Sequence, residues 1–367
     1  MFNDIQNIKL QGKLYTVKEL KYFCEQKINS PVVQAWEKDI CLFIQDWFSA
    51  SKTITVTTSG STGAPKKIKL QKQHMIASAK ATLSFFNLKK GDSAWLCLPV
   101  KYIAGKMMIV RAIVGELNLV YSEPTSIPIL DKSSKVNLAA MVPNQVHELL
   151  KTQKGLIQLQ KIDNLLIGGA GISDKLEKRL LNLPEILAWH SYGMTETITH
   201  IAIRSLSNIS MFGNYYPLPG IKISVNNNSQ LIINAPAIGV NNLITNDIAQ
   251  QFDDGSFSVI GRADNVIISG GIKLHPEIIE AKIKKHISNN FFVGGIPDSV
   301  LGQKLVLFIE ENENLNENSD FNYEIFYQNL SKFEKPKEII FFKNFLKTEN
   351  GKLRRKVMIN SYVRLFE

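Results

Sequence analysis

The stretch from Ser59 to Lys66, SGSTGAPK, has the composition of a loop that binds phosphate oxygens. Glycines let the backbone approach a ligand closely, hydroxyl and amide groups donate hydrogen bonds to oxyanions, and the Lys66 ammonium adds positive charge. It is not a Walker loop, because Lys66 follows Ala64-Pro65 and no Ser or Thr comes after it. The six residues from Thr58 to Gly63 are all Gly, Ser or Thr, which favours a phosphate-binding loop over a surface turn.

The elements around this loop predict how it is positioned. β-Branched residues flank the loop on both sides, so a strand is expected before it and another after it. Helical spacing of apolar residues predicts helices over 30–48, 71–87, 103–115, 144–153 and 173–183, the last with Ser173 as its N-cap. Short apolar runs predict strands within 93–100, 117–124, 136–143 and 161–170. Strands that alternate with helices predict a largely parallel sheet.

The pattern changes after Leu206. Two short strands within 223–234 and a hairpin-like stretch at 252–262 with an Asp-Gly turn predict antiparallel β structure. A helix over 275–287 with Pro276 near its start, strands within 291–297, 304–310 and 337–342, and a helix near 322–333 predict a small α+β unit. The polar segment 311–320 is expected to be an exposed loop. The predicted fold class is α/β in several layers, with parallel-rich sheets, an antiparallel β subdomain and a small C-terminal α+β domain.

Composition narrows the class of protein. The 367 residues are 44% hydrophobic and 21% charged, which is ordinary for a globular chain. No apolar run is long enough for a membrane helix and no signal peptide is visible, so a cytoplasmic protein without integral membrane association is expected. The three cysteines are far apart in sequence, which predicts neither a disulfide framework nor a CxxC metal clip.

The net charge of +10 allows three interpretations: nucleic-acid binding, a small polyanionic ligand, or coding bias towards lysine. Because the lysines are spread along the chain and no nucleic-acid-binding motif is present, no nucleic-acid partner is expected. Small-molecule substrates are the expected partners. The oligomeric state stays open, with a homodimer as one alternative.

With its preceding threonines, the glycine loop resembles the phosphate-binding signature of the adenylate-forming superfamily, which contains acyl-CoA synthetases, luciferases and peptide-synthetase adenylation domains. Further signatures of this superfamily follow in order. They are IGGAG (167–171), SYGMTET (191–197), ITND (244–247, with Asn246 in place of glycine), GRADNVIISGGIKLHPEIIE (261–280) and KTENGKLRR (347–355, with Leu346 in place of proline).

The resemblance implies that a carboxylate attacks the α-phosphate of ATP to give an acyl-adenylate and pyrophosphate, after which a thiol, usually that of coenzyme A, displaces AMP. It implies a phosphate site made of Thr58, Ser59, Gly60, Ser61, Thr62, Gly63 and Lys66. Gly169 and Ala170 would border the adenine, Tyr192 would stack on it beside Gly193, and Asp247 and Arg262 would bind the ribose. Thr195 would contact the α-phosphate, and Glu196 would bind Mg²⁺.

The resemblance also implies two domains, 1–263 and a mobile 264–367, with Asp264 as the hinge. Lys352 would neutralise the charge that develops on the α-phosphate during adenylation. Gly270 and Gly271 would line a narrow tunnel for the pantetheine arm of coenzyme A.

One further segment bears on which carboxylic acid would be the substrate. Residues Leu98 to Gly115, together with the compact N-terminal half, resemble o-succinylbenzoate–CoA ligases of menaquinone biosynthesis, except that Lys101-Tyr102 replaces the usual aromatic-His pair. An aromatic dicarboxylate needs an anchor for its second carboxylate, and the candidates around the acyl group are Lys101, Tyr102, Lys106, Arg111, Thr199 and His200. Another aryl- or acyl-CoA ligase, a stand-alone enzyme that loads a carrier protein, and a relative without catalysis remain alternatives.

Overall fold

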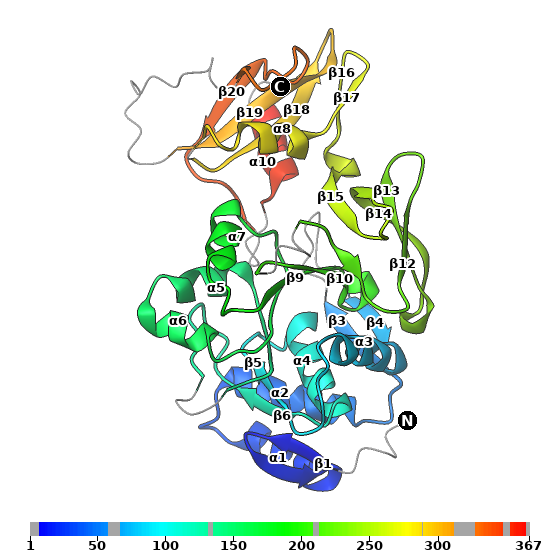
Figure 1. Ribbon diagram of the computed structural model, residues 1–367, viewed down its shortest axis with the longest axis vertical. Helices are drawn as coiled ribbons and strands as arrows, with labels where there is room; N and C mark the ends of the chain where they lie inside the picture. Colours follow the sequence, from blue (N-terminus) through cyan, green and yellow to red (C-terminus); the bar gives the residue numbers. More distant parts are fainter. Residues whose placement is uncertain are drawn as a thin grey trace.

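The computed structural model describes residues 7–57, 67–130, 135–207, 213–287, 289–311, 327–347 and 353–364. Within these residues, a nine-stranded sheet of order β11-β10-β9-β8-β7-β5-β6-β1-β2 occupies the larger part of the molecule (Figure 1). From β9 to β1 the strands are parallel, and β2, β10 and β11 add antiparallel edges. The bounds are Asn7–Leu10 (β1), Lys13–Thr16 (β2), Ser93–Leu96 (β5), Asn118–Tyr121 (β6), Leu138–Met141 (β7), Leu165–Ile167 (β8), Ala188–Gly193 (β9), His200–Ser205 (β10) and Tyr216–Pro217 (β11).

Helices cover both faces of this sheet. Side chains alternate across a strand, so Leu138 and Ala140 of β7 join one buried cluster while Ala139 and Met141 join the other. Helices α1 (Val17–Asn29), α2 (Ala35–Trp47), α3 (Lys72–Phe85) and α4 (Ile103–Val114) pack on the first face. Helices α5 (Pro143–Leu150), α6 (Gln153–Leu159) and α7 (Asp174–Leu181) pack on the second.

Two antiparallel sheets accompany the large one. A hairpin of β3 (Thr53–Thr57) and β4 (Lys67–Gln71) stands before α3. Four strands, β12 (Lys222–Val225), β13 (Gln230–Ala235), β14 (Val240–Gln251) and β15 (Phe257–Arg262), form the second sheet. Its buried residues Leu231, Ile233 and Phe257 belong to the first cluster of the large sheet, so both sheets share one core.

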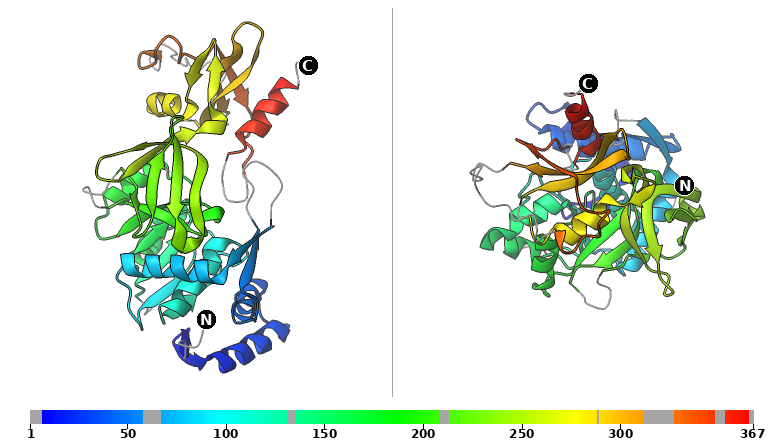
Figure 2. Two further views of the ribbon diagram at one scale, coloured as in Figure 1. Left: turned by 90° about the vertical axis from the view of Figure 1, so that its right-hand side faces the viewer. Right: turned by 90° about the horizontal axis from the view of Figure 1, so that it is seen from above.

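The C-terminal part is built around its own sheet. It contains β16 (Ile267–Ser269), β17 (Ile272–Leu274), α8 (Pro276–Ile283), β18 (Phe291–Asp298), β19 (Gly302–Glu310), β20 (Glu338–Phe342) and α10 (Arg355–Val363). Its buried residues form two separate clusters, one around Ile279 and Leu307 and one around Phe292 and Phe308. Figures 1 and 2 show this part at one end of an elongated molecule.

Helices α1 and α2 form a hairpin, and an ion pair and two thiols make contacts between them. Lys27 Nζ lies 2.8 Å from Glu37 Oε1 across the two helices. The thiols of Cys24 and Cys41 hydrogen-bond to each other in the buried contact between them, and all three cysteines are free and buried. The structure thus brings together two cysteines that their sequence separation kept apart.

The predicted fold class is confirmed, and most predicted elements are present. Helix α2 begins at Ala35, five residues after its expected start, and β5 ends at Leu96. The hairpin β1–β2, the helices α1 and α10 and the strand β14 were not predicted individually. The predicted loop 311–320 and the helix near 322–333 fall largely outside the described residues. Within the described part of the chain, no helix is long and apolar enough to cross a membrane.

Candidate active site

Two of the predicted groups lie outside the described residues: Thr58, Ser59, Gly60, Ser61, Thr62, Gly63 and Lys66 of the glycine loop, and Lys352. The described residues fix where these segments begin and end. Thr57 and Lys67 are opposite partners at the end of the β3–β4 hairpin, so the glycine loop connects two paired strands, as predicted. Lys347 and Leu353 form an antiparallel bridge on the two sides of the Lys352 segment.

The turn after β8, which carries Gly169 and Ala170, is held in place by two consecutive residues of β9. Ser191 Oγ donates a hydrogen bond to the Ile167 carbonyl at 3.1 Å, and His190 Nε2 lies 3.2 Å from the Ala170 carbonyl. Gly169 has φ +84°, a left-handed conformation that favours glycine. The turn lies at the carboxyl end of a parallel strand, where ligands bind in open α/β sheets.

The protonation of His190 follows from its neighbours. Its Nδ1 lies 2.7 Å from the hydroxyl of Tyr215 and 3.4 Å from Nε of Arg204, which is a donor. Nδ1 therefore accepts, and Nε2 carries the hydrogen that it donates to Ala170. Burial, together with the charge of Arg204, lowers the pKa of His190 to about 4, so the ring is neutral at pH 7. Sequence reasoning missed this residue, whose only signal was its position two residues before Tyr192.

Tyr192, Asp247 and Arg262, which were predicted to bind adenosine, are brought together. The Tyr192 hydroxyl donates to Asp247 Oδ2 at 2.5 Å, and Arg262 Nη1 donates to Asp247 Oδ1 at 3.0 Å. The ring of Tyr192 packs edge-on against Phe257, 5.3 Å between centroids. Asp247 is thus a fixed carboxylate that can accept hydrogen bonds from a ribose.

Arg262 also contacts the predicted hinge. Its Nε donates to Asp264 Oδ1 at 2.9 Å, and Lys356 of α10 lies 3.7 Å from the other oxygen. Although burial raises the pKa of the Asp264 carboxyl, the hydrogen bond and charge of Arg262 hold it below its ordinary value. Arg262 therefore contacts both Asp247, which was predicted to bind the ribose, and Asp264, the predicted hinge.

Thr195 and Glu196 lie in the short connection between β9 and β10, in a 3₁₀ turn over Thr195–Thr197. Glu196 is exposed, and so is Gly193 at the end of β9. Among the described residues, no group of three or more His, Cys, Asp or Glu side chains is arranged to hold a metal ion. A single exposed carboxylate fits the way Mg²⁺ is usually bound, by one or two carboxylates together with substrate phosphates.

The acyl-site candidates separate into two groups. Arg111, Thr199 and His200 are close together: Arg111 Nη2 lies 3.5 Å from His200 Nδ1, and His200 Nε2 lies 3.3 Å from the Thr82 hydroxyl of α3. The Thr199 hydroxyl contacts Ser78 of the same helix at 2.9 Å. These residues form a polar cluster between α3, α4 and β10.

Arg111 carries a charge in this cluster with no carboxylate beside it among the described residues. It is 2% exposed, and its Nε has no hydrogen-bond partner there. Burial lowers the pKa of Arg111 to about 10, so the side chain stays charged at neutral pH. Burial and the charge of Arg111 hold the pKa of His200 well below its ordinary value, so the imidazole is neutral. A buried, uncompensated guanidinium is suited to bind an anion.

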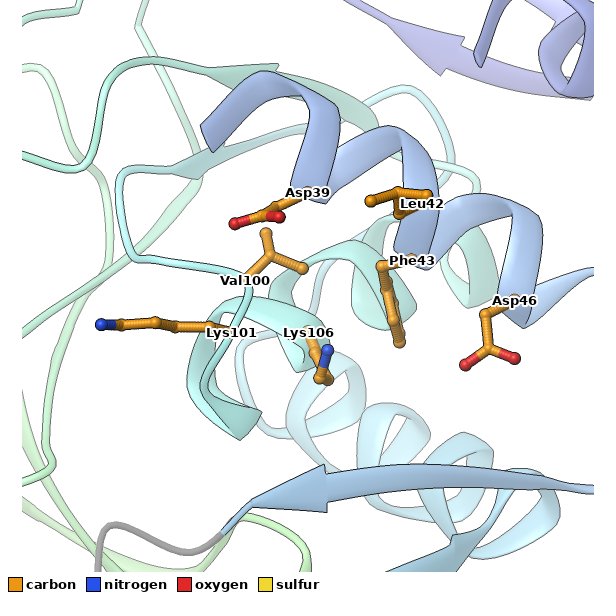
Figure 3. Close-up of a pocket in the computed structure, with 7 residues that line it drawn as sticks. All are labelled: Asp39, Leu42, Phe43, Asp46, Val100, Lys101 and Lys106. Atoms are coloured by element: carbon orange, nitrogen blue, oxygen red, sulfur yellow. The ribbon is translucent and has the colours of Figure 1, made fainter. Parts of the chain in front are cut away.

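Lys101 and Lys106 lie elsewhere. They line a cavity of about 280 Å³ between α2 and the start of α4, together with Asp39, Leu42, Phe43, Asp46 and Val100 (Figure 3). Lys106 Nζ lies 4.9 Å from the centroid of the Phe43 ring, and Lys101 Nζ lies 4.9 Å from that of Tyr102. Lys106 and Arg111 are five residues apart, which is about 140° around a helix, so they face different sides of α4.

Gly270 and Gly271 form the two-residue turn between β16 and β17. Both have positive φ, +56° and +81°, the pattern of a hairpin turn that favours glycine. A Cβ atom at Gly271 would have no neighbour within 4 Å, so packing leaves the space beside this residue open. The backbone geometry alone explains why both positions are glycine. The open space beside Gly271 is compatible with a bound ligand.

Comparison with known proteins gives one family. The model of the AMP-binding enzymes matches residues 45–234, just over half of the chain. A 2-succinylbenzoate–CoA ligase of Listeria monocytogenes is 27% identical over 85% of this chain and 70% of its own length. The crystal structure of an acyl-CoA synthetase (AMP-forming)/AMP-acid ligase II-like protein from Dyadobacter fermentans is 33% identical, with a TM-score of 0.62 over 93% of this chain and 98% of that one. The Escherichia coli MenE structure is 17% identical with a TM-score of 0.71, over 99% of this chain and 97% of that chain, and shows a likeness of fold.

Proposed function

Because the chain belongs to the AMP-binding enzyme family, we propose that it adenylates o-succinylbenzoate with ATP and then transfers the acyl group to coenzyme A. Its class, an AMP-forming acid–CoA ligase of the adenylate-forming superfamily, rests on the family match and on several relatives that are 2-succinylbenzoate–CoA ligases. The specific acid and the roles of individual residues are the proposal.

In the first half-reaction, a carboxylate oxygen of the acid bonds to the α-phosphorus of ATP and the bond to pyrophosphate breaks. The acid is already ionised at neutral pH, so no general base is needed. Asp247, held by Tyr192 and Arg262, would bind the ribose hydroxyls, while the turn with Gly169 and Ala170 would border the adenine. Thr195 would contact the α-phosphate, and Mg²⁺ held by Glu196 would offset phosphate charge.

In the second half-reaction, the sulfur of coenzyme A bonds to the acyl carbon and AMP leaves. We assign Lys352 to the first step and Gly270 and Gly271 to the second, with Asp264 as the hinge between domains 1–263 and 264–367. The separate buried clusters of the C-terminal part support this division. The ion pairs of Asp264 with Arg262 and Lys356 would have to change when the domain turns.

The observation that carries the choice of acid is Arg111. A monocarboxylic acid uses its single carboxylate in the reaction and would leave the buried guanidinium uncompensated. A dicarboxylic acid offers a second carboxylate that can pair with Arg111 beside the neutral His200. The structure favours Arg111 over Lys101 and Lys106 for this contact, because the two lysines line the separate cavity against α2.

A pyrophosphate-release assay across a panel of carboxylic acids, with and without coenzyme A, tests the proposal. Turnover with o-succinylbenzoate and formation of its CoA thioester are expected. Robust turnover with benzoate or a fatty acid, and none with o-succinylbenzoate, would contradict the choice of acid. Pyrophosphate release with coenzyme A inert as acceptor would favour an enzyme that loads a carrier protein.

A further inference from the structure

The connection between β9 and β10 contains an unusual backbone conformation. Ile198 has φ +67° and ψ −59°, and the Thr199 N–H donates to the Thr197 carbonyl at 2.7 Å. This is a γ-turn of the positive-φ kind, which is rare and strained, and Ile198 is β-branched, which makes the conformation more costly. Such strain persists only where the surrounding structure imposes it, and it is concentrated at functional sites.

Two features impose this conformation. Ile198 is 2% exposed and packs in the core of the large sheet, so its burial holds the turn from one side. Thr197 is fully buried, and its hydroxyl accepts from the Met194 N–H at 3.0 Å. The same hydroxyl lies 3.0 Å from the Met194 carbonyl and 2.8 Å from the Thr199 carbonyl, so it can donate to either one. One side chain therefore closes the loop from Met194 to Thr199.

The closed loop has proposed ligand groups on both sides. Thr195 and Glu196 lie near its start. Thr199, the last residue of the γ-turn, contacts Ser78, and His200, the next residue, contacts Thr82 and Arg111. The loop also packs closely on the end of β9, because a Cβ atom at Gly193 would come within 2.2 Å of the Thr199 carbonyl oxygen and only glycine fits there. The distance between the phosphate-side and acid-side groups is therefore set by this turn.

We propose that Thr197 is a positioning residue for adenylate formation, which holds Thr195 and Glu196 in register with the acid bound at Thr199 and His200. This inference rests on the proposed function. The hydroxyl acts through the backbone of the loop and contacts neither ATP nor the acid. Loss of the hydroxyl should displace Glu196 and Thr195 while the acid-side contacts remain, and a displacement of about 1 Å can cost roughly a hundredfold in rate.

The test compares Thr197→Val, which keeps the shape but removes the hydroxyl, with Thr197→Ser, which keeps the hydroxyl. Thr197→Ala replaces the valine variant if that protein does not fold. Ser205→Ala is the matched control, because it removes a different buried hydroxyl, on β10, which accepts from the Ser207 N–H away from the loop. Alongside the unfolding temperature and the KM for the acid, three quantities are measured: the rate of adenylate formation, the Mg²⁺ concentration at half-maximal rate, and the rate of thioester formation from preformed acyl-adenylate.

For Thr197→Val we expect adenylate formation to fall by about ten- to a hundredfold, the required Mg²⁺ concentration to rise, and the KM for the acid and the thioester step to change little. Thr197→Ser should restore both the rate and the Mg²⁺ dependence, and Ser205→Ala should leave them unchanged. A purely structural role would lower the unfolding temperature of Thr197→Val with all three quantities unchanged, or lower both half-reactions equally. Either result would overturn the proposal.

Further measurements distinguish failure of the proposed function from failure of the proposed role of Thr197. If the unaltered protein adenylates a different acid, the same comparison is made with that acid. If it adenylates none, the Mg²⁺ dependence of ATP binding is measured by calorimetry for the unaltered protein and Thr197→Val. An unchanged dependence rejects the role of Thr197, and a weakened one supports it even though the choice of reaction is wrong.

Discussion

Replacing Arg111 by methionine should make the protein more stable and less able to use a dicarboxylic acid. Methionine fills similar space and carries no charge. The guanidinium of Arg111 is buried beside a neutral His200, and no carboxylate compensates it among the described residues. Replacing buried charges by apolar side chains of similar volume is often neutral or stabilising.

The expected changes in stability and in activity follow from the burial of Arg111. A fall in its pKa from 12.5 to about 10 corresponds to roughly 3 kcal/mol against the charged form in the folded protein. Some of this should return as stability in Arg111→Met, about 1–3 kcal/mol. Conversely, removal of one partner of a buried charge pair costs about 2–5 kcal/mol of binding. We therefore expect kcat/KM for o-succinylbenzoate to fall by about thirtyfold or more.

The assay measures pyrophosphate release with o-succinylbenzoate and with benzoate, alongside denaturant unfolding. Lys106→Met is the matched control, because it makes the same kind of change on another face of α4. Only Arg111→Met should reduce the preference for the dicarboxylate. A variant that loses activity with both acids equally, or that keeps its preference, would refute the assignment of Arg111. A marked loss of stability would refute the view that its charge is uncompensated.

Three further predictions concern other residues. Lys352→Ala should abolish adenylate formation and spare thioester formation from preformed adenylate; normal adenylate formation would reject its role. Asp264→Pro should slow the thioester step more than adenylation in single-turnover kinetics, whereas equal losses would argue against a hinge. The pKa of His190 is lower in the folded protein, about 4, than its ordinary value of 6.5. The contribution of this residue to the free energy of unfolding should therefore be fully present above pH 6.5 and fall by roughly 3 kcal/mol as the pH drops to 4. Denaturant unfolding of His190→Gln should show a weaker dependence over this pH range; an unchanged slope would contradict it.

The features of the fold that depend on local sequence patterns were predicted correctly. Alternating strands and helices gave the parallel sheet, and the ordered signatures led to Tyr192, Asp247 and Arg262, which the structure brings into hydrogen-bond contact. These residues are far apart in the chain, so their common role at the adenosine was inferred from the resemblance and not from spacing. The short hairpin β1–β2 and helix α1 were missed, because their mixed polar and apolar residues give a weak periodic signal.

The acid-binding side could not be resolved from sequence for a different reason. Helix α4 has apolar residues on most sides, so its pattern did not indicate which face meets β10. The residue pattern therefore did not distinguish Lys106 from Arg111 as the anchor for the second carboxylate. In the structure, Lys106 lines the cavity against α2 and Arg111 lies beside His200. The γ-turn at Ile198 was likewise hidden, because the preferences of a β-branched residue argue against the conformation that the fold imposes.

The separation of the buried clusters bears on how such an enzyme can diversify. The groups proposed to contact the acid all lie between Ser78 and His200, in the core shared by the large sheet and the β12–β15 sheet. The residues from Ile267 onward form clusters of their own. Mutations that reshape the acid site therefore leave the packing of the C-terminal part intact. The acid specificity of the N-terminal part can therefore change during evolution while the C-terminal part stays the same. Exchange of the C-terminal part between relatives need not alter the choice of acid.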